Sequence, residues 1–430
     1  MATQFKTLLP QTARLPAEAR EIALLAARPA ILNAQRWFAH QRAWINEQHL
    51  QLCRIPAPTF FERQRAEWFC SQLAGLGWAS RQDRAGNVLA EFGGRQTPVT
   101  IVSAHLDTVL APGRPEQIYF APDGRLIGPG VSDNGSGLSA VLALARVLAE
   151  NTDLHDLASS VLLVANVGEE GEGNLNGMRY LCEQPGQIAG IQAFVVLDGP
   201  STDHITAQAL ASRRFEVSFS GPGGHSWNDH GRPNPVHALS DLINQFVQNA
   251  DAKAANERLV RFSYNFGIIE GGTSINSIPS SARAKLDLRS EEPATLDELS
   301  AMLARAMERS LEQANRSATA GRLSAKIKEL GSRPGGKLGH DALLLRTIQA
   351  VDAYLNIRSR IDCASTDANV PLSLGLSAIS IGSGGAGGGA HTSQEWYQPD
   401  GRHLGLQRIL LLLAALAAQN SPEGLSSTSE

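Results

Sequence analysis

The chain has 430 residues, 43% hydrophobic and 19% charged, with a formal net charge of −4. This length allows two domains, and the weakly acidic balance excludes the basic surface that binds nucleic acid or an anionic membrane. We expect neither partner. The four cysteines are scattered and the first residues lack the apolar core of a signal peptide, which predicts a cytoplasmic protein with reduced thiols.

The first half of the chain predicts helices followed by alternating strands and helices. Residues 11–30 and 34–52 have helical composition and make up most of an N-terminal helical extension over residues 1–50. From residue 88 onward, apolar strands alternate with helices, which predicts an α/β fold with a mostly parallel sheet flanked by helices. The strands are expected at 88–92, 99–105, 160–167, 191–197 and 376–381, and the helices at 62–76, 138–150, 174–183, 340–355 and 401–419.

The pattern changes over residues 208–320. Strands with alternating polar and apolar residues are expected at 213–220, 262–266 and 282–289, with helices at 235–251 and 295–315. Such strands are wet on one face, so we predict an inserted α+β domain made of an antiparallel sheet and two helices. The parallel-sheet pattern is expected to return at 323–328. Residues 1–207 and 321–430 then form the two parts of one domain.

Acidic or histidine residues lie at or just after the ends of the predicted parallel strands. A further acidic residue lies in the loop before the helix at 138–150. Loops at the carboxyl ends of parallel strands converge on one crevice, so we expect these side chains to meet there. Each residue alone has an ordinary structural explanation, but their joint placement predicts a metal centre. The candidates are His105, Asp133, Glu169, Glu170, Asp198 and His391.

The residue types indicate which metal and which roles. Imidazoles and carboxylates without thiolate fit zinc first, with cobalt or manganese as alternatives. Asp133, in the glycine-rich loop Gly128–Gly137, could be shared by two divalent cations. Asp107, two positions after His105, could accept a hydrogen bond from that imidazole. Glu169 and Glu170 point to opposite sides of an extended chain, so one could bind metal and the other act as general base.

In this order and spacing, these motifs resemble the M20 family of metal-dependent exopeptidases and deacylases, from about Leu50 to Ala417. The resemblance implies one metal on His105 and Asp198 and another on Glu170 and His391. Asp133 would bridge them, with a cis peptide bond after it, and Glu169 would be the general base.

The resemblance also gives the inserted domain a role as a lid and dimerisation domain, so a homodimer through residues 208–320 is expected. His225, in Gly-Pro-Gly-Gly-His-Ser, would stabilise the oxyanion, often across the dimer interface. Asn276 and Arg289 match substrate-contacting positions. Thr366 matches a Thr/Ser-Asp motif that contacts substrate, although the glycine pair that usually precedes it is absent here.

We therefore predict a dinuclear metal-dependent hydrolase that cleaves a terminal amide bond of a small peptide or acyl amino acid. His391-Thr-Ser-Gln-Glu395 resembles the ending of peptidase T-like members, which favours an aminopeptidase. A carboxypeptidase or N-acyl amino acid deacylase is the alternative. A non-catalytic binding relative would be expected to lack a ligand or the base, and none is missing.

Overall fold

The computed structural model describes residues 16–256 and 260–419. The chain forms two compact units. The first unit contains the residues up to Ala207 and from Lys337 onward, and the inserted unit is Gln208–Gly336. Within the described residues, every helix is too short or too polar to cross a lipid bilayer.

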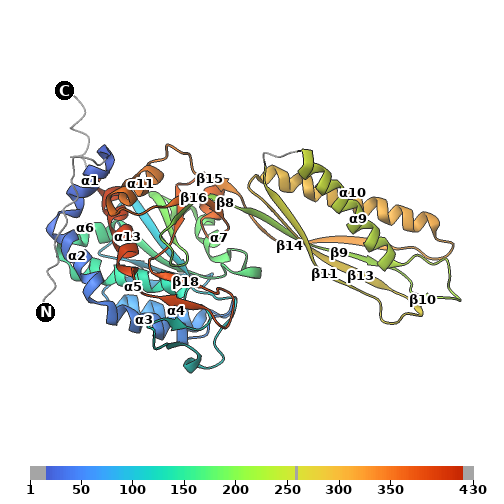
Figure 1. The fold of residues 1–430 in the computed structure, drawn as a ribbon, viewed down its shortest axis with the longest axis horizontal. Helices are drawn as coiled ribbons and strands as arrows, with labels where there is room; N and C mark the ends of the chain where they lie inside the picture. Colours follow the sequence, from blue (N-terminus) through green and yellow to red (C-terminus); the bar gives the residue numbers. More distant parts are fainter. Residues whose placement is uncertain (1–15, 257–259, 420–430) are drawn as a thin grey trace. The chain divides into compact units, whose positions relative to one another are not determined.

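A nine-stranded sheet, counted over residues 16–256 and 260–419, forms the centre of the first unit (Figure 1). Its strands are β1 (Ala79–Gln82), β2 (Val88–Glu91), β3 (Val99–His105), β6 (Val161–Asn166), β7 (Ile191–Leu197), β8 (His204–Ala209), β15 (Gly336–Lys337), β16 (Arg360–Ala364) and β17 (Ala378–Ile381). The order is β1-β2-β6-β3-β7-β17-β8-β15, with β16 paired to β8. The central strands β6, β3, β7 and β17 pair in parallel, and β1, β2 and β8 add antiparallel pairs toward the edges. The prediction of a mostly parallel sheet is confirmed.

Helices flank this sheet because its strands are apolar on both sides. Every residue of β3 and β6 is buried, so both faces of the sheet are covered. Helices α5 and α13 are buried along most of their length and pack against each other in the main core. The helices of this unit are α1 (Ala17–Ala26), α2 (Pro29–His40), α3 (Arg42–Arg54), α4 (Arg63–Gly75), α5 (Gly135–Glu150), α6 (His155–Ser159), α7 (Asn176–Glu183), α8 (Pro185–Ile188), α11 (Leu343–Leu355), α12 (Asn369–Ser373) and α13 (Arg402–Ala418).

The N-terminal extension differs from the prediction. Residues 11–15 lie outside the described residues, and the single helix expected over 34–52 is wrong, because the chain turns at Gln41 between α2 and α3. The corner packs Trp37 against Trp44 with ring centroids 5.8 Å apart. The Arg146 guanidinium of α5 lies 4.5 Å from the Trp44 ring centroid. Aromatic and cation–π contacts thus hold the corner onto α5.

A small four-stranded sheet brings two distant segments of the first unit together. It contains β4 (Tyr119–Phe120), β5 (Leu126–Ile127), β18 (Ala386–Gly388) and β19 (Trp396–Gln398) in the order β18-β19-β5-β4. Strand β5 leads directly into the glycine-rich loop, and the His391 segment connects β18 to β19. Pairing of Trp396 with Ile127 therefore places the His391 segment beside the loop that carries Asp133.

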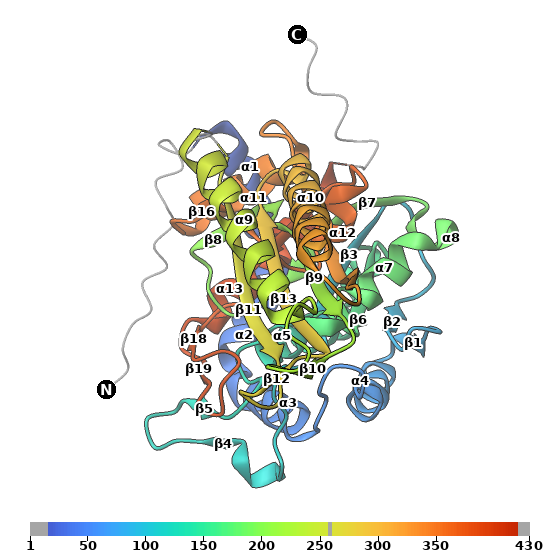
Figure 2. The same cartoon turned by 90° about the vertical axis from the view of Figure 1, so that its right-hand side faces the viewer.

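The inserted unit is an antiparallel sheet with two long helices on one face (Figure 2). The strand order is β11-β13-β9-β14, and β10 and β12, which are far apart in the chain, pair as a separate two-stranded antiparallel ribbon. Phe215, Val217 and Phe219 of β9 alternate with polar residues and pack into the core under the helices. The elements are β9 (Ala211–Ser220), β10 (Gly224–His225), α9 (Pro235–Asn256), β11 (Phe262–Gly271), β12 (Ser277–Ile278), β13 (Ser281–Ser290), α10 (Pro293–Ser317) and β14 (Ser324–Arg333).

The end of the inserted unit is a correction to the sequence analysis. Residues 323–328 were expected to return to the parallel sheet, with a boundary after residue 320. Instead, β14 pairs with β9 along its length, from Ser324 opposite Ser220 to Arg333 opposite Ser212, and the unit continues to Gly336. Burial alternates over the first half of β14, residues 324–328, as in a strand with one wet face, and the pairing with β9 places the strand in the antiparallel sheet.

Candidate metal centre and active site

Three neighbouring parallel strands end in residues that were predicted to bind metal or act as base. Strand β3 ends at His105, β6 is followed by Glu169 and Glu170, and β7 is followed by Asp198. Because β6, β3 and β7 are adjacent, their carboxyl-end loops lie side by side. The register pairs His105 with Asn166, so the two loops begin at the same level of the sheet.

Asp133 lies close to the residues at these strand ends, although it is in the loop that precedes α5. Helix α5 begins at Gly135, and the Asn134 side chain accepts a hydrogen bond from the Gly137 amide at 3.2 Å. Asn134, rather than Asp133, therefore caps the helix. The Asp133–Asn134 peptide is cis, as the family resemblance implied. Gly130 has φ +76, and a Cβ there would lie 2.4 Å from Thr108 Cγ2, so close packing requires this glycine.

Among the described residues, the side chains form three overlapping groups, each with its ligand atoms within 4.8 Å of one another. The first is His105, Asp133 and Asp198, and the second is Asp133, Glu170 and His391, so that Asp133 is common to these two. The third group is His105, Glu169 and Glu170, which brings the predicted base beside the ligands. The first two groups are the sets that the resemblance implied for two metal ions, although their role as ligands stays a prediction.

The two oxygens of Asp133 face different histidines. Oδ1 lies 3.0 Å from His105 Nε2, and Oδ2 lies 3.3 Å from His391 Nε2. The same His391 nitrogen is 3.0 Å from Glu170 Oε1. His391 has φ +64, a conformation that a residue with a side chain rarely adopts and that commonly occurs at functional sites. One carboxylate with an imidazole at each oxygen has the arrangement needed to bridge two cations.

The electrostatics of the cluster fit bound cations. Burial, followed by the negative charge of Glu169, raises the pKa of Glu170 to about 7. Burial and the charge of Asp133 raise the pKa of Asp198 well above its usual value. For Asp133, burial acts in the upward direction, but hydrogen bonds with His105 and His391 hold its pKa below the usual value. Divalent cations would relieve the repulsion among these carboxylates, so the donor set fits two of them.

Asp107 was expected to accept a hydrogen bond from His105 through its carboxylate, but the structure uses it differently. His105 Nδ1 lies 3.0 Å from the Asp107 backbone carbonyl and 3.6 Å from its carboxylate. The carboxylate instead accepts the backbone amides of Glu169 and Glu170, each at 2.9 Å, and the Thr59 hydroxyl at 3.0 Å. Asp107 therefore orients the imidazole with its backbone and fixes the Glu169–Glu170 loop with its side chain.

Two residues that the sequence analysis did not assign also support these loops. Glu62 is buried, and its Oε1 accepts the amides of Phe60 and Gly168 at 3.0 and 3.1 Å. His49 of α3 is fully buried, with Nε2 2.7 Å from the Val131 carbonyl. The Arg402 guanidinium is 3.1 Å from His49 Nδ1 and can only donate, so Nε2 carries the proton that Val131 accepts. The N-terminal extension thus contacts the metal loop directly.

Thr366 lies in the turn just before α12 and is buried. Its hydroxyl accepts the Ala368 amide at 3.2 Å, and its own amide donates to Asn369 Oδ1 at 2.9 Å. These local bonds fix Thr366 against the first turn of α12. Beside it, Asp367 is buried and accepts from Asn166 Nδ2 at 2.6 Å. Burial, with the charge of Glu169, raises the pKa of Asp367 to about 7. Contact of Thr366 with substrate stays a prediction.

His225 and Asn276 lie together at the β10–β12 ribbon of the inserted unit. The Ser226 amide donates to the Asn276 carbonyl at 3.0 Å. His225 is exposed, and its Nδ1 accepts the amides of Trp227 and Asn228 at 3.2 and 3.3 Å. Nε2 therefore carries the ring proton and is available as a donor. This is the property that the predicted oxyanion role requires.

Arg289 lies on β13 of the inserted unit, with its Nε 2.8 Å from Asp287 Oδ2. The other oxygen of Asp287 is 3.2 Å from Arg214 Nε. A substrate carboxylate at Arg289 would therefore share the guanidinium with Asp287, which orients it. Contact of Arg289 with substrate stays a prediction.

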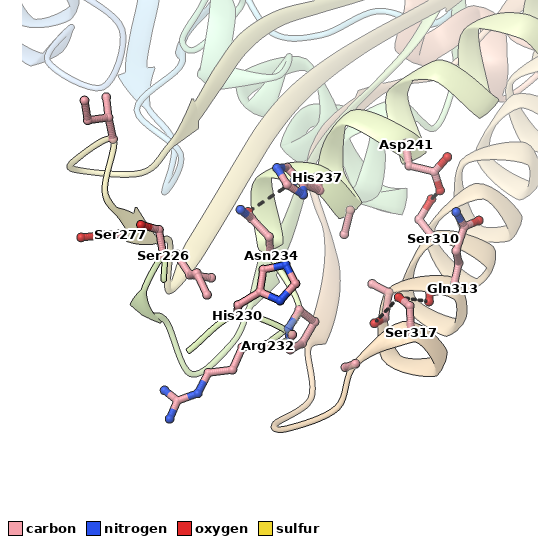
Figure 3. A pocket seen from close by; sticks show the side chains of 17 residues that line it. Ser226, His230, Arg232, Asn234, His237, Asp241, Ser277, Ser310, Gln313 and Ser317 are labelled. Carbon is pink, nitrogen blue, oxygen red and sulfur yellow. Dashed lines mark hydrogen bonds between the residues drawn. The ribbon is translucent and has the colours of Figure 1, made fainter. Parts of the chain in front are cut away.

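The inserted unit also contains a cavity of about 500 Å³ between the start of α9 and the end of α10 (Figure 3). Ser226 and Ser277, the sequence neighbours of His225 and Asn276, line it. Two charged residues of its lining have partners of their own. Arg232 pairs with Asp229 at 2.9 Å, and Asp241 accepts from the Ser310 hydroxyl at 2.7 Å. The cavity thus borders the β10–β12 ribbon, beside which the two predicted substrate contacts lie.

Comparison with known proteins gives two family matches. A model described as peptidase family M28 matches residues 87–220, and an M20 model described as a peptidase dimerisation domain matches residues 211–315. A probable succinyl-diaminopimelate desuccinylase of Staphylococcus epidermidis is 27% identical over 239 residues. That match covers 48% of this chain and 57% of the relative, so the chain spans little more than half the length of this curated relative.

Solved structures share the fold over most of the chain. The aminopeptidase PepT of Bacillus cereus superposes with a TM-score of 0.69 at 16% identity and covers 87% of this chain and 99% of its own. A dinuclear metal binding peptidase from the M20 family of Bacillus subtilis has a TM-score of 0.63 at 16% identity, with 88% and 99% covered. At these identities the likeness concerns the fold.

Proposed function

We propose that this chain, which belongs to the M20 family of metallopeptidases, is a dinuclear metal-dependent hydrolase that cleaves a terminal amide bond of short peptides. The observation that carries the proposal is the position of Asp133, whose two oxygens belong to two different groups of ligand atoms. In this proposal, His105 and Asp198 would hold one cation, Glu170 and His391 would hold the other, and Asp133 would contribute to both.

Two divalent cations at this site would polarise the substrate carbonyl and lower the pKa of a water molecule. Glu169 acts as the general base: it accepts the proton of the attacking water and delivers it to the leaving nitrogen. Its side chain is 5% exposed, which keeps bulk water from competing for that proton. Because Asp107 fixes the amides of both Glu169 and Glu170, it sets the position of the base relative to a ligand.

Zinc is our first choice of metal. Two imidazoles with three carboxylates and no thiolate form a borderline-to-hard donor set, which zinc accepts and which cobalt or manganese also fit. Calcium and magnesium prefer oxygen donors alone, so the histidines at both positions disfavour them.

We propose an aminopeptidase acting on short peptides, because the His391-Thr-Ser-Gln-Glu395 segment resembles peptidase T-like members and the fold matches an aminopeptidase. A carboxypeptidase or N-acyl amino acid deacylase is the second candidate. It is favoured by the likeness to a desuccinylase and by Arg289, whose guanidinium suits a substrate carboxylate.

We further propose that the inserted unit forms a homodimer and supplies His225 to the oxyanion, with Asn276 and Arg289 contacting substrate. The match to a peptidase dimerisation domain over residues 211–315 supports the dimer. The proton on His225 Nε2 supports the role of a hydrogen-bond donor. The four free cysteines, all within the described residues, are consistent with a reducing cytoplasm.

The test is a hydrolysis assay of protein reconstituted with zinc, cobalt or manganese. The substrates are dipeptides and tripeptides with free or blocked amino ends, peptides with free or amidated carboxyl ends, and N-acyl amino acids. Cleavage that requires a free amino end supports the aminopeptidase, and cleavage of blocked substrates supports the second candidate. A protein that holds two metals and cleaves none of them would exclude both.

A further inference from the structure

One buried carboxylate holds the backbone of the metal loop. Glu395 is 2% exposed, and its side chain accepts three backbone amides of that loop. Oε1 lies 2.7 Å from the Ser132 nitrogen and 2.8 Å from the Asp133 nitrogen, and Oε2 lies 2.8 Å from the Gly130 nitrogen. The backbone of Glu395 adds a fourth bond, because its carbonyl accepts the Gly128 amide at 2.8 Å.

These contacts require a carboxylate of this length. Three amides point at one side chain, so every contacting atom must be an acceptor, and an ionised carboxylate has two acceptor oxygens. A glutamine would turn an N–H₂ group toward at least one amide, which leaves that amide unsatisfied in a buried place. An aspartate keeps the charge but is one methylene shorter and cannot reach all three amides from the same backbone position.

Glu395 also connects the two groups of ligand atoms. It lies four positions after His391, in the segment that pairs with β5, and one of its three amide partners belongs to Asp133 itself. The second group thus contains His391 from the Glu395 segment and Asp133 from the loop that Glu395 binds. A shift of this side chain would move the bridging carboxylate relative to His391.

Resting on the proposed function, we propose that Glu395 is a positioning residue that sets Asp133 between the two metals and thereby couples their binding. It touches neither substrate nor the predicted ligand atoms of Asp133, and acts through the backbone of residues 130–133. With the loop held, one carboxylate is in place for both cations at once. Without it, Asp133 serves one cation at a time, so the second metal binds more weakly than the first.

The test compares Glu395→Gln with Glu395→Asp in metal-free protein titrated with zinc by calorimetry. For wild type we expect two metals per chain. For Glu395→Gln we expect about 10–100-fold weaker binding of the second metal, as for other residues that orient ligands. Glu395→Asp keeps the charge and should lie between them. Amide hydrogen exchange of residues 130–133 should be faster in both variants than in wild type.

Asp352→Asn is the control for loss of stability alone. Asp352 is buried and pairs with Arg408, with 2.7 Å between Oδ1 and Nε, away from the metal loop. This variant should lower the melting temperature yet leave zinc affinity within about twofold, since it changes no ligand support. All titrations are made at a temperature at which each variant is folded by circular dichroism.

The proposal is overturned if Glu395→Gln binds two metals as tightly as wild type, or if Asp352→Asn weakens zinc to the same extent. If Glu395→Gln does not fold, Glu395→Asp and the exchange rates decide by the same criteria. A wild type that binds two metals without cleaving any test substrate contradicts the proposed function but leaves the role of Glu395 standing.

Discussion

His105 Nε2 and Asp133 Oδ1 lie 3.0 Å apart, although one residue ends a strand and the other precedes a helix. The second oxygen of Asp133 lies toward His391. A carboxylate with an imidazole at each oxygen explains why a single acidic residue belongs to both groups of ligand atoms. The position of this one side chain therefore carries the dinuclear interpretation.

Asp133→Ala should abolish the binding of both metals. The change removes the carboxylate that both groups share, and each remaining pair of ligands is too small to hold a divalent cation tightly. Metal content per chain, measured by atomic emission after dialysis against a dilute chelator, should fall from about two to near zero. Activity should be lost with it.

The matched control for that variant is Asp123→Ala. Asp123 lies in the turn before the same loop, is largely exposed and pairs only locally, with Arg125 Nε 2.7 Å from its Oδ2. It should keep two metals and full activity. Retention of two metals by Asp133→Ala would refute the shared-ligand assignment.

Glu169→Gln should separate metal binding from turnover. Glutamine has nearly the same shape but cannot accept the proton of the attacking water, so kcat should fall by about 10²–10⁴-fold while metal content stays unchanged. Glu172→Gln changes an exposed residue three positions later in the same loop and is the control. It should leave kcat and metal content unchanged. A decrease of only a few-fold in Glu169→Gln would mean that another group is the base.

The ends of β3, β6 and β7 were predictable because apolar runs and polar residues at their ends are local features of the sequence. The turn at Gln41 was not predictable from the sequence, because no proline or glycine directly precedes it. Tertiary contacts of Trp37 and Trp44 fix this corner instead. The first half of β14 carried a usable signal, since the alternation over residues 324–328 indicates a strand with one wet face.

The residues that hold the loops of the site in place could not be predicted from the sequence, for a different reason. Glu395 and His49 act through backbone atoms of residues 130–133, and a backbone amide or carbonyl leaves no trace in the sequence. Asp107 was placed correctly near His105, but the partners of its carboxylate depend on the level at which β6 ends beside β3. Spacing identifies chemical groups, whereas register determines which groups they contact.

His49 predicts a pH dependence of stability. Its pKa lies well below the usual value of 6.5, because burial and then the positive charge of Arg402 disfavour the protonated ring. In the unfolded chain the ring takes up a proton as the pH falls through that usual value, and the folded chain resists this. The stability that His49 contributes is therefore complete above about pH 7 and is lost as the pH falls, by up to about 1.4 kcal/mol per pH unit.

The check is urea unfolding of metal-free protein at about pH 8 and about pH 5, in wild type and His49→Gln. Glutamine can donate to Val131 and accept from Arg402 but does not titrate. The free energy of unfolding of wild type should therefore fall more between the two pH values than that of the variant. His40→Gln, on the exposed end of α2, should follow wild type. Equal decreases for wild type and His49→Gln would contradict the prediction.

The last prediction asks which subunit supplies His225. His225→Ala and Glu169→Gln should each be nearly inactive alone, the first because the oxyanion loses a donor and the second because the base is lost. If His225 acts across the dimer, a mixed dimer has one site with Glu169 from one subunit and an intact His225 from its partner. Random mixing then restores about one quarter of wild-type activity.

If His225 acts within its own chain, each site of the mixed dimer lacks one group and no activity returns. Different affinity tags on the two variants allow mixed dimers to be purified. Absence of activity then cannot result from a failure of the subunits to exchange between dimers. His230→Ala is the matched control, because it changes a histidine that lines the neighbouring cavity and leaves the hydrogen bonds of the His225 ring with the Trp227 and Asn228 amides in place, and it should keep activity. Recovery in the mixed dimer would show that the inserted unit completes the partner's active site.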